Sequence, residues 1–259
     1  MNFSIGQYYP GTSVIHRMDP RVKMVLMLVY IILIFFIGSF AGYAAAGLFT
    51  MAMILWTKIP LRFFIKVLKP LMFLIIITFV MNLFAYGDHF RPTLHGLGMA
   101  FRMALRLVYL VVGCQMLTLT TSTMDVTSAM EDLLSPLKKL RFPVHELSMM
   151  MTIALRFIPT LMEETDKIIR AQKSRGADFE SGNLLQRAKA MVPLLVPLFV
   201  SSFRRADELA MAMEARCYRG GEGRTRMKQL RSTRLDLWAC LVFAAYGILI
   251  ILDKIFLGA

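Results

Sequence analysis

Long apolar runs are the feature that most limits what this chain can fold into. Several of them approach the roughly 20 residues that an α-helix needs to cross a bilayer. Of the 259 residues, 57% are hydrophobic, and the mean hydropathy of +0.58 is far above that of a soluble domain. The sequence therefore predicts an all-α integral membrane protein with about five transmembrane helices, at about 22–40, 44–56, 71–86, 99–121 and 235–257.

The predicted spans divide the chain into three regions. Residues 1–121 form a membrane region with four spans, and residues 235–259 hold the final span. Residues 122–234 lie between them and contain 19 of the 30 Lys and Arg residues and 13 of the 17 Asp and Glu residues. This polar region predicts a block of long cytosolic helices before the last span, at about 125–134, 144–175 and 184–217.

The two longer helices of this block each begin apolar and end charged. Their apolar halves, 147–162 and 190–203, are shorter than a full span. An arrangement with seven spans, in which these halves cross the bilayer as a hairpin, is the alternative. It is disfavoured because both halves are short and Arg156 lies within the first. An arginine in such a segment needs a partner, so we expect a structural ion pair with Glu163 and Glu164.

Basic residues near the span ends predict the orientation of the chain. The N-terminal segment holds Arg17, Arg21 and Lys23, whereas residues 38–43 between the first two spans hold no basic residue. The positive-inside rule then places the N-terminus in the cytosol and the C-terminus outside the cell membrane. The formal charge of +13 fits basic residues that flank spans and meet anionic lipid, rather than nucleic acid.

Two of the predicted cytosolic helices end in the same pattern, Ala-x-x-small-Arg-small. It is AQKSRG at 171–176 and AMEARC at 212–217. One such arginine is most simply a cation near a helix C-terminus, worth about 0.3–1 kcal/mol. Here the pattern occurs twice at matching positions, and a guanidinium binds carboxylates through a two-pronged contact. The repetition predicts two similar acidic partners that bind at Ser174-Arg175-Gly176 and Ala215-Arg216-Cys217.

These ends also support a resemblance that extends over essentially the whole chain. The segments GQYYPG at 6–11 and IHRMDPR at 15–21, the segment LRFIPTL at 155–161 and the two arginine motifs are similar to one family's motifs. That family is the transmembrane T component of energy-coupling factor transporters, the vitamin-uptake branch of the ABC transporters. One residue departs from its pattern: Cys217 stands where the family usually has glycine. We therefore expect this helix to continue a further turn, to Gly220-Gly221.

The resemblance implies a function and a set of partners. It implies a scaffold subunit of an ATP-driven vitamin or micronutrient transporter, which couples two cytosolic ATPase subunits to a separate membrane S component that binds substrate. The arginine motifs would bind the ATPases, and ATP would be bound by those subunits. The chain itself has no Gly-x-x-x-x-Gly-Lys-Ser/Thr motif, catalytic constellation or metal-ligand spacing, so no enzyme activity, cofactor or metal is expected.

A self-contained secondary carrier or channel is the rival function. Such a protein needs polar or ionisable residues near the middle of several spans. The predicted spans 22–40, 44–56 and 235–257 carry almost none between their ends. The sequence does not identify the substrate, because in this family the substrate is bound by the separate S component.

Overall fold

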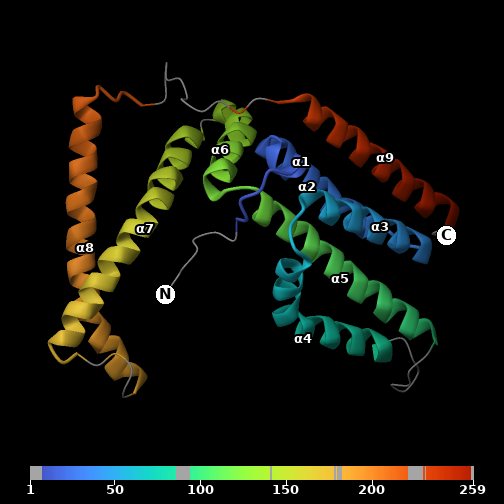
Figure 1. The fold of residues 1–259 in the computed structure, drawn as a ribbon, viewed down its shortest axis with the longest axis horizontal. Helices are drawn as coiled ribbons and strands as arrows, with labels where there is room; N and C mark the ends of the chain where they lie inside the picture. Colours follow the sequence, from blue (N-terminus) through green and yellow to red (C-terminus); the bar gives the residue numbers. More distant parts are fainter. Residues whose placement is uncertain are drawn as a thin grey trace. The chain divides into compact units, whose positions relative to one another are not determined.

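A computed structural model describes residues 8–85, 94–140, 142–177, 179, 183–220, 230 and 232–257. Among these residues it contains helices and no β-strand, which confirms the predicted all-α membrane fold (Figure 1). The helices are α1 Val14–Arg17, α2 Pro20–Phe36, α3 Phe40–Thr57, α4 Leu61–Ala85, α5 Leu94–Thr120, α6 Thr123–Leu134, the 3₁₀ helix η1 Ser135–Leu140, α7 Val144–Ser174, α8 Leu184–Ala215 and α9 Arg234–Leu257.

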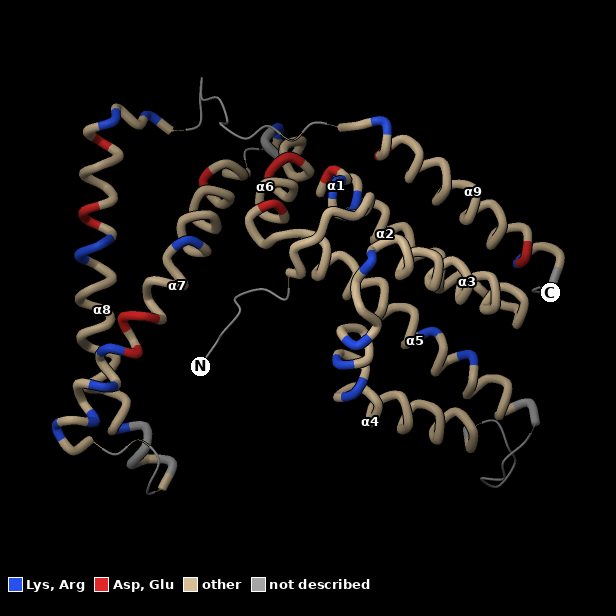
Figure 2. The backbone as a smooth tube through the Cα atoms, in the orientation of Figure 1, with Lys and Arg blue, Asp and Glu red and all other residues tan. Residues whose placement is uncertain are grey.

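The chain folds as two compact units. The first unit comprises Met1–Leu133 and Lys228–Ala259, and the second comprises Leu134–Met227. Most of α6 therefore belongs with the membrane helices, whereas the sequence grouped residues 122–134 with the polar helical block. The second unit contains η1 and the helix pair α7 and α8, and this pair carries charges of both signs along its length (Figure 2).

The first unit contains the helices that are suited to a bilayer. By length and composition, Phe40–Thr57, Leu61–Phe84, Gly96–Thr120 and Arg234–Phe256 can each cross a membrane. The first predicted span appears as α2, which has 17 residues and ends at Phe36. Large apolar side chains remain exposed on these helices, as expected for contact with lipid: Leu48 at 75%, Phe73 at 75% and Phe256 at 78%.

Helix α2 begins at Pro20, two residues before the predicted start of the first span. Asp19 is the N-cap of α2, and its side chain accepts a hydrogen bond from the backbone N–H of Arg21. Pro20 occupies the first turn, where its missing N–H costs nothing because that group has no partner within the helix. The Asp-Pro pair thus defines the start of α2 through local chemistry alone.

The third span begins earlier than predicted. Helix α4 starts at Leu61 rather than at residue 71, so Arg62, Lys66 and Lys69 lie on a helix and not in a loop. Pro70 lies inside α4, and this helix bends along its length (Figure 1). A proline removes one i→i−4 hydrogen bond and clashes with the preceding turn, which bends a helix without necessarily ending it.

Helix α5 is central to the packing of the first unit. It contacts α2, α3 and α4, while α9 packs against α2 and α3. The buried ring of Tyr30 on α2 lies in this core, where its hydroxyl is within hydrogen-bond distance of Thr50 Oγ1 at 2.8 Å and donates to the Tyr109 carbonyl at 3.3 Å. Gly113 of α5 faces that ring, and a Cβ at this position would collide with it.

We therefore expect Gly113→Val to destabilise the first unit. The added side chain must displace the Tyr30 ring from its hydrogen bonds, and overpacking of this kind costs about 1–3 kcal/mol. Thermal unfolding of the purified protein in detergent measures the loss. The control is Gly247→Ala, because a Cβ there meets only Leu33, at 3.5 Å, an ordinary contact distance. Equal melting temperatures for the two variants would contradict the tight packing.

Candidate functional site at two helix ends

Helices α7 and α8 form an antiparallel pair within the second unit. Helix α8 runs back along α7, and the two helices contact one another (Figure 1). Near the other end of the pair, the Tyr218 hydroxyl donates to Met149 Sδ over 3.1 Å. The C-terminal ends of α7 and α8 therefore lie at opposite ends of the pair.

Between these ends, an ion pair links the two helices and an apolar hollow lies beside it. Glu164 of α7 accepts a hydrogen bond from Arg205 of α8, with 3.2 Å between the Arg205 guanidinium nitrogen and Glu164 Oε2. A hollow of about 250 Å³ lies beside this pair, and its lining includes Phe157, Leu161 and Leu209. These contacts fix how the two helices run past one another.

The ion pair differs from the one that the sequence predicts. Glu164 is paired with Arg205, and in the described part of the chain neither Glu163 nor Glu164 forms an ion pair with Arg156, whose side chain is exposed. Residues seven or eight positions apart on one helix are two turns distant, whereas a facing helix brings Arg205 within reach. No periodicity within α7 reveals a partner on α8.

Helix α7 ends in a Schellman cap that contains the first arginine motif. Arg175 is the C-cap residue, and Gly176 has the left-handed φ of +87°. The N–H of Gly176 donates to the Lys173 carbonyl at 3.0 Å, and the N–H of Ala177 donates to the Gln172 carbonyl at 3.0 Å. These two bonds satisfy carbonyls that the last helical turn leaves unpaired.

Helix α8 ends in the same cap, which the sequence did not predict. The N–H of Cys217 donates to the Glu214 carbonyl at 2.8 Å, and the N–H of Tyr218 donates to the Met213 carbonyl at 3.0 Å. Cys217 has φ of +57°, so it takes the left-handed position that Gly176 takes in α7. The expected further turn to Gly220-Gly221 is wrong, because α8 ends at Ala215; Gly221 lies outside the described residues.

Tyr218 supplies the physical reason for this early end. Its backbone N–H completes the cap, and its hydroxyl reaches Met149 on α7. Together these contacts hold the chain in a turn that Cys217 adopts less readily than glycine would. The sequence signal was a large aromatic residue directly after the small one, since Schellman caps often place an apolar side chain at that position.

The two caps present their arginines in the same way. Arg175 and Arg216 each follow the last helical residue, and both side chains are exposed. The flanking residues Ser174, Gly176, Ala215 and Cys217 are also exposed. In the described part of the chain, no carboxylate forms an ion pair with either guanidinium. Each helix end can therefore offer an unobstructed fork of N–H donors to a carboxylate on another protein.

The fold and the helix ends define a class of protein: an all-helical membrane protein whose charged helix pair presents two separate arginine-bearing ends. A family model described as "Cobalt transport protein" matches residues 11–227. The energy-coupling factor transporter transmembrane protein of Clostridium kluyveri is 53% identical over 99% of this chain and 98% of its own length. That of Bacillus subtilis is 49% identical over 90% of this chain and 91% of its own.

A third such protein, from Lactococcus lactis, is 43% identical over 97% of both chains. This level of identity over nearly the full length shows the family. The chain belongs to the transmembrane proteins of energy-coupling factor transporters and is the transmembrane component of such a transporter. Nothing in these comparisons favours a self-contained carrier or channel.

The two caps predict opposite effects of two substitutions. Gly176→Ala should weaken the cap of α7 by about 1 kcal/mol, because a non-glycine residue is strained at this φ. The effect is one of backbone strain alone, since no heavy atom lies within 4 Å of the added Cβ. Cys217→Gly should stabilise the cap of α8. Hydrogen exchange, measured by mass spectrometry, should become faster at the Ala177 amide in Gly176→Ala. It should become slower at the Tyr218 amide in Cys217→Gly. Unchanged exchange in both would contradict the caps.

Proposed function

We propose that this chain is the scaffold that joins two cytosolic ATPase subunits to a separate membrane subunit that binds a vitamin or other micronutrient. The observation that carries this proposal is the pair of identical caps, each with one exposed arginine, at opposite ends of one helix pair. Two similar docking points on one helix pair fit two copies, or two close relatives, of one kind of partner. The family resemblance supports an ATPase of the ABC class as that partner.

The proposed mechanism depends on the two caps lying at opposite ends of the helix pair. Because α7 and α8 are antiparallel, each ATPase subunit would hold one end of the pair. When the two subunits close on ATP, they would move Arg175 and Arg216 relative to one another. The Glu164–Arg205 ion pair and the packing of α7 against α8 would transmit that movement along the helices. The chain would contribute no ATP site and no cofactor, because it has no phosphate-binding loop motif.

The proposed location is the cell membrane, with the N-terminus in the cytosol and the C-terminus outside. The distribution of basic residues supports this orientation. Lys58, Arg62, Lys66 and Lys69 follow α3 or lie on the first turns of α4, on the same predicted side as Arg17. With an even number of crossings between the N-terminus and the second unit, both arginine caps would be on the cytosolic side, where the ATPases would bind.

Charge reversal at the two caps tests the docking role. Arg175→Glu and Arg216→Glu should each weaken binding of one ATPase by about 2 kcal/mol or more, roughly 30-fold, because the new carboxylate faces an acidic partner. The double variant should lose both subunits. Co-purification from membranes with the ATPases, followed by substrate uptake in liposomes, measures both effects.

Matched controls separate the caps from charge in general. Lys167→Glu on α7 and Arg204→Glu on α8 make the same charge reversal at exposed positions outside the two capping motifs. These variants should keep assembly and uptake near the unmodified level. If the double cap variant also kept full assembly and uptake, the proposed docking would be wrong. Uptake by the isolated chain in liposomes without ATPases would support the rival carrier instead.

Cysteine labelling tests the orientation. In a variant without native cysteines, Asn2→Cys should react with a membrane-impermeant maleimide only after the cells are permeabilised. Ala259→Cys should react in intact cells, because the last helix carries the chain outward. Labelling of both positions on the same side would contradict the odd number of spans.

A further inference from the structure

Two connections along the chain join the membrane unit to the helix-pair unit. The chain leaves the first unit at Leu133 and re-enters it at Lys228. Helix α6 precedes the first connection, and Leu230 is the first described residue after the second. Whatever movement the chain itself carries from one unit to the other must pass through these two points.

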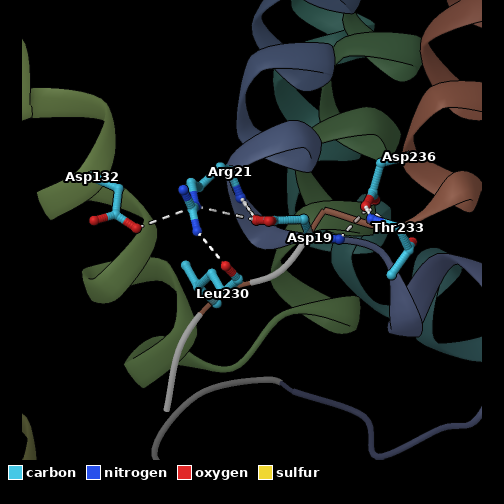
Figure 3. Close-up of polar contacts among 6 residues, drawn as sticks. All are labelled: Asp19, Arg21, Asp132, Leu230, Thr233 and Asp236. Atoms are coloured by element: carbon cyan, nitrogen blue, oxygen red, sulfur yellow. Dashed lines mark hydrogen bonds and ion pairs between the residues drawn. The ribbon is translucent and has the colours of Figure 1, made fainter. Parts of the chain in front are cut away.

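One side chain of the first unit contacts the ends of both connections. The Arg21 Nε lies 3.2 Å from Asp132 Oδ2, which belongs to α6 just before the first connection. A terminal nitrogen of the same guanidinium donates to the Leu230 carbonyl at 2.8 Å. Figure 3 shows Arg21 between these two groups, with Asp19 on its other side at 3.6 Å from Nε.

Hydrogen bonds at the start of α2 hold the backbone of Arg21 in place. Asp19 caps α2 by accepting from the backbone N–H of Arg21 at 2.9 Å, and its own N–H donates to Asp236 Oδ1 at 2.8 Å. Asp236 is 3% exposed and accepts from the Thr233 backbone N–H at 2.6 Å and from its hydroxyl at 3.0 Å. The starts of α2 and α9 are thus joined, and Arg21 extends from that junction (Figure 3).

The chemistry of the contact favours arginine. A guanidinium has donors that diverge in a fixed plane, so it can hold a carboxylate and a carbonyl at the same time. A lysine ammonium on a flexible stem would pair with one of them less rigidly. With its side chain 33% exposed, Arg21 is reachable by water but shielded on the side of Asp19, whose side chain is 1% exposed.

We infer that Arg21 is the positioning residue that fastens both connections to the membrane unit, so that movement of α7 and α8 is passed to α2, α6 and α9. This role rests on the proposed function, in which the ATPases drive that movement. Arg21 touches neither ATP nor substrate. Without Arg21, the two connections would be less restrained. Part of each ATP-driven movement would then displace the connections and not the spans.

The ratio of ATP hydrolysed to substrate transported tests this role. The complete transporter, with both ATPases and the substrate-binding subunit, is reconstituted in liposomes. Arg21→Gln should assemble and hydrolyse ATP, but this ratio should rise about tenfold, because a charge-assisted contact at both connections is lost. Asp132→Asn, which frees only the first connection, should raise it about threefold. The double variant should be no worse than Arg21→Gln alone.

The matched control is Arg17→Gln, an exposed arginine four residues earlier in the same segment. It should leave the ratio unchanged. A normal ratio in Arg21→Gln would overturn the inference. If Arg21→Gln does not assemble, a normal ratio in Asp132→Asn would overturn it. A variant in which ATP hydrolysis and transport fall by the same factor would also overturn it. Co-purified ATPases in the same preparation show that docking at Arg175 and Arg216 is intact, so a failure of the proposed function is recognised separately.

Discussion

Within a bilayer, every backbone N–H and C=O group must form its hydrogen bond inside the protein, and this requirement governs the fold. Helices satisfy this need along their length but leave four N–H and four C=O groups unpaired at their ends. The polar contacts that organise this protein accordingly gather at helix ends. Asp19 and Asp236 meet at the starts of α2 and α9, and Arg175 and Arg216 stand at the capped C-termini of α7 and α8. The same requirement thus positions both the structural junction and the proposed docking points.

The two units differ in the surfaces that they expose and in the contacts that hold them together. The first unit exposes apolar side chains to lipid and buries a core around Tyr30. The second is a helix pair held by the Glu164–Arg205 ion pair, with an exposed arginine at each end. In the proposed mechanism, force enters at these two ends while the first unit remains packed in the bilayer. Arg21 stands where the chain passes from one unit to the other.

Local features of this protein could be predicted from sequence, and pairings between distant residues could not. The apolar runs predicted long apolar helices, four of which can cross a membrane by length and composition, and the repeated pattern located both arginine ends. By contrast, Cys217 takes its left-handed turn because Tyr218 is anchored on another helix, and Glu164 finds Arg205 across the helix pair. The ion pair of Arg21 with Asp132 and its hydrogen bond to Leu230 likewise join segments far apart in the chain. A single sequence shows periodicity along a helix but not the identity of the facing residue.

The most direct measurement is the structure of the complete transporter by electron cryomicroscopy. The proposed mechanism requires two docking points of equal chemistry at opposite ends of one helix pair. It predicts density for Arg175 within hydrogen-bond distance of a carboxylate on one ATPase subunit, and for Arg216 in the same relation to the other subunit. A map in which either guanidinium faces solvent or lipid, or in which both contact a single ATPase subunit, would contradict it.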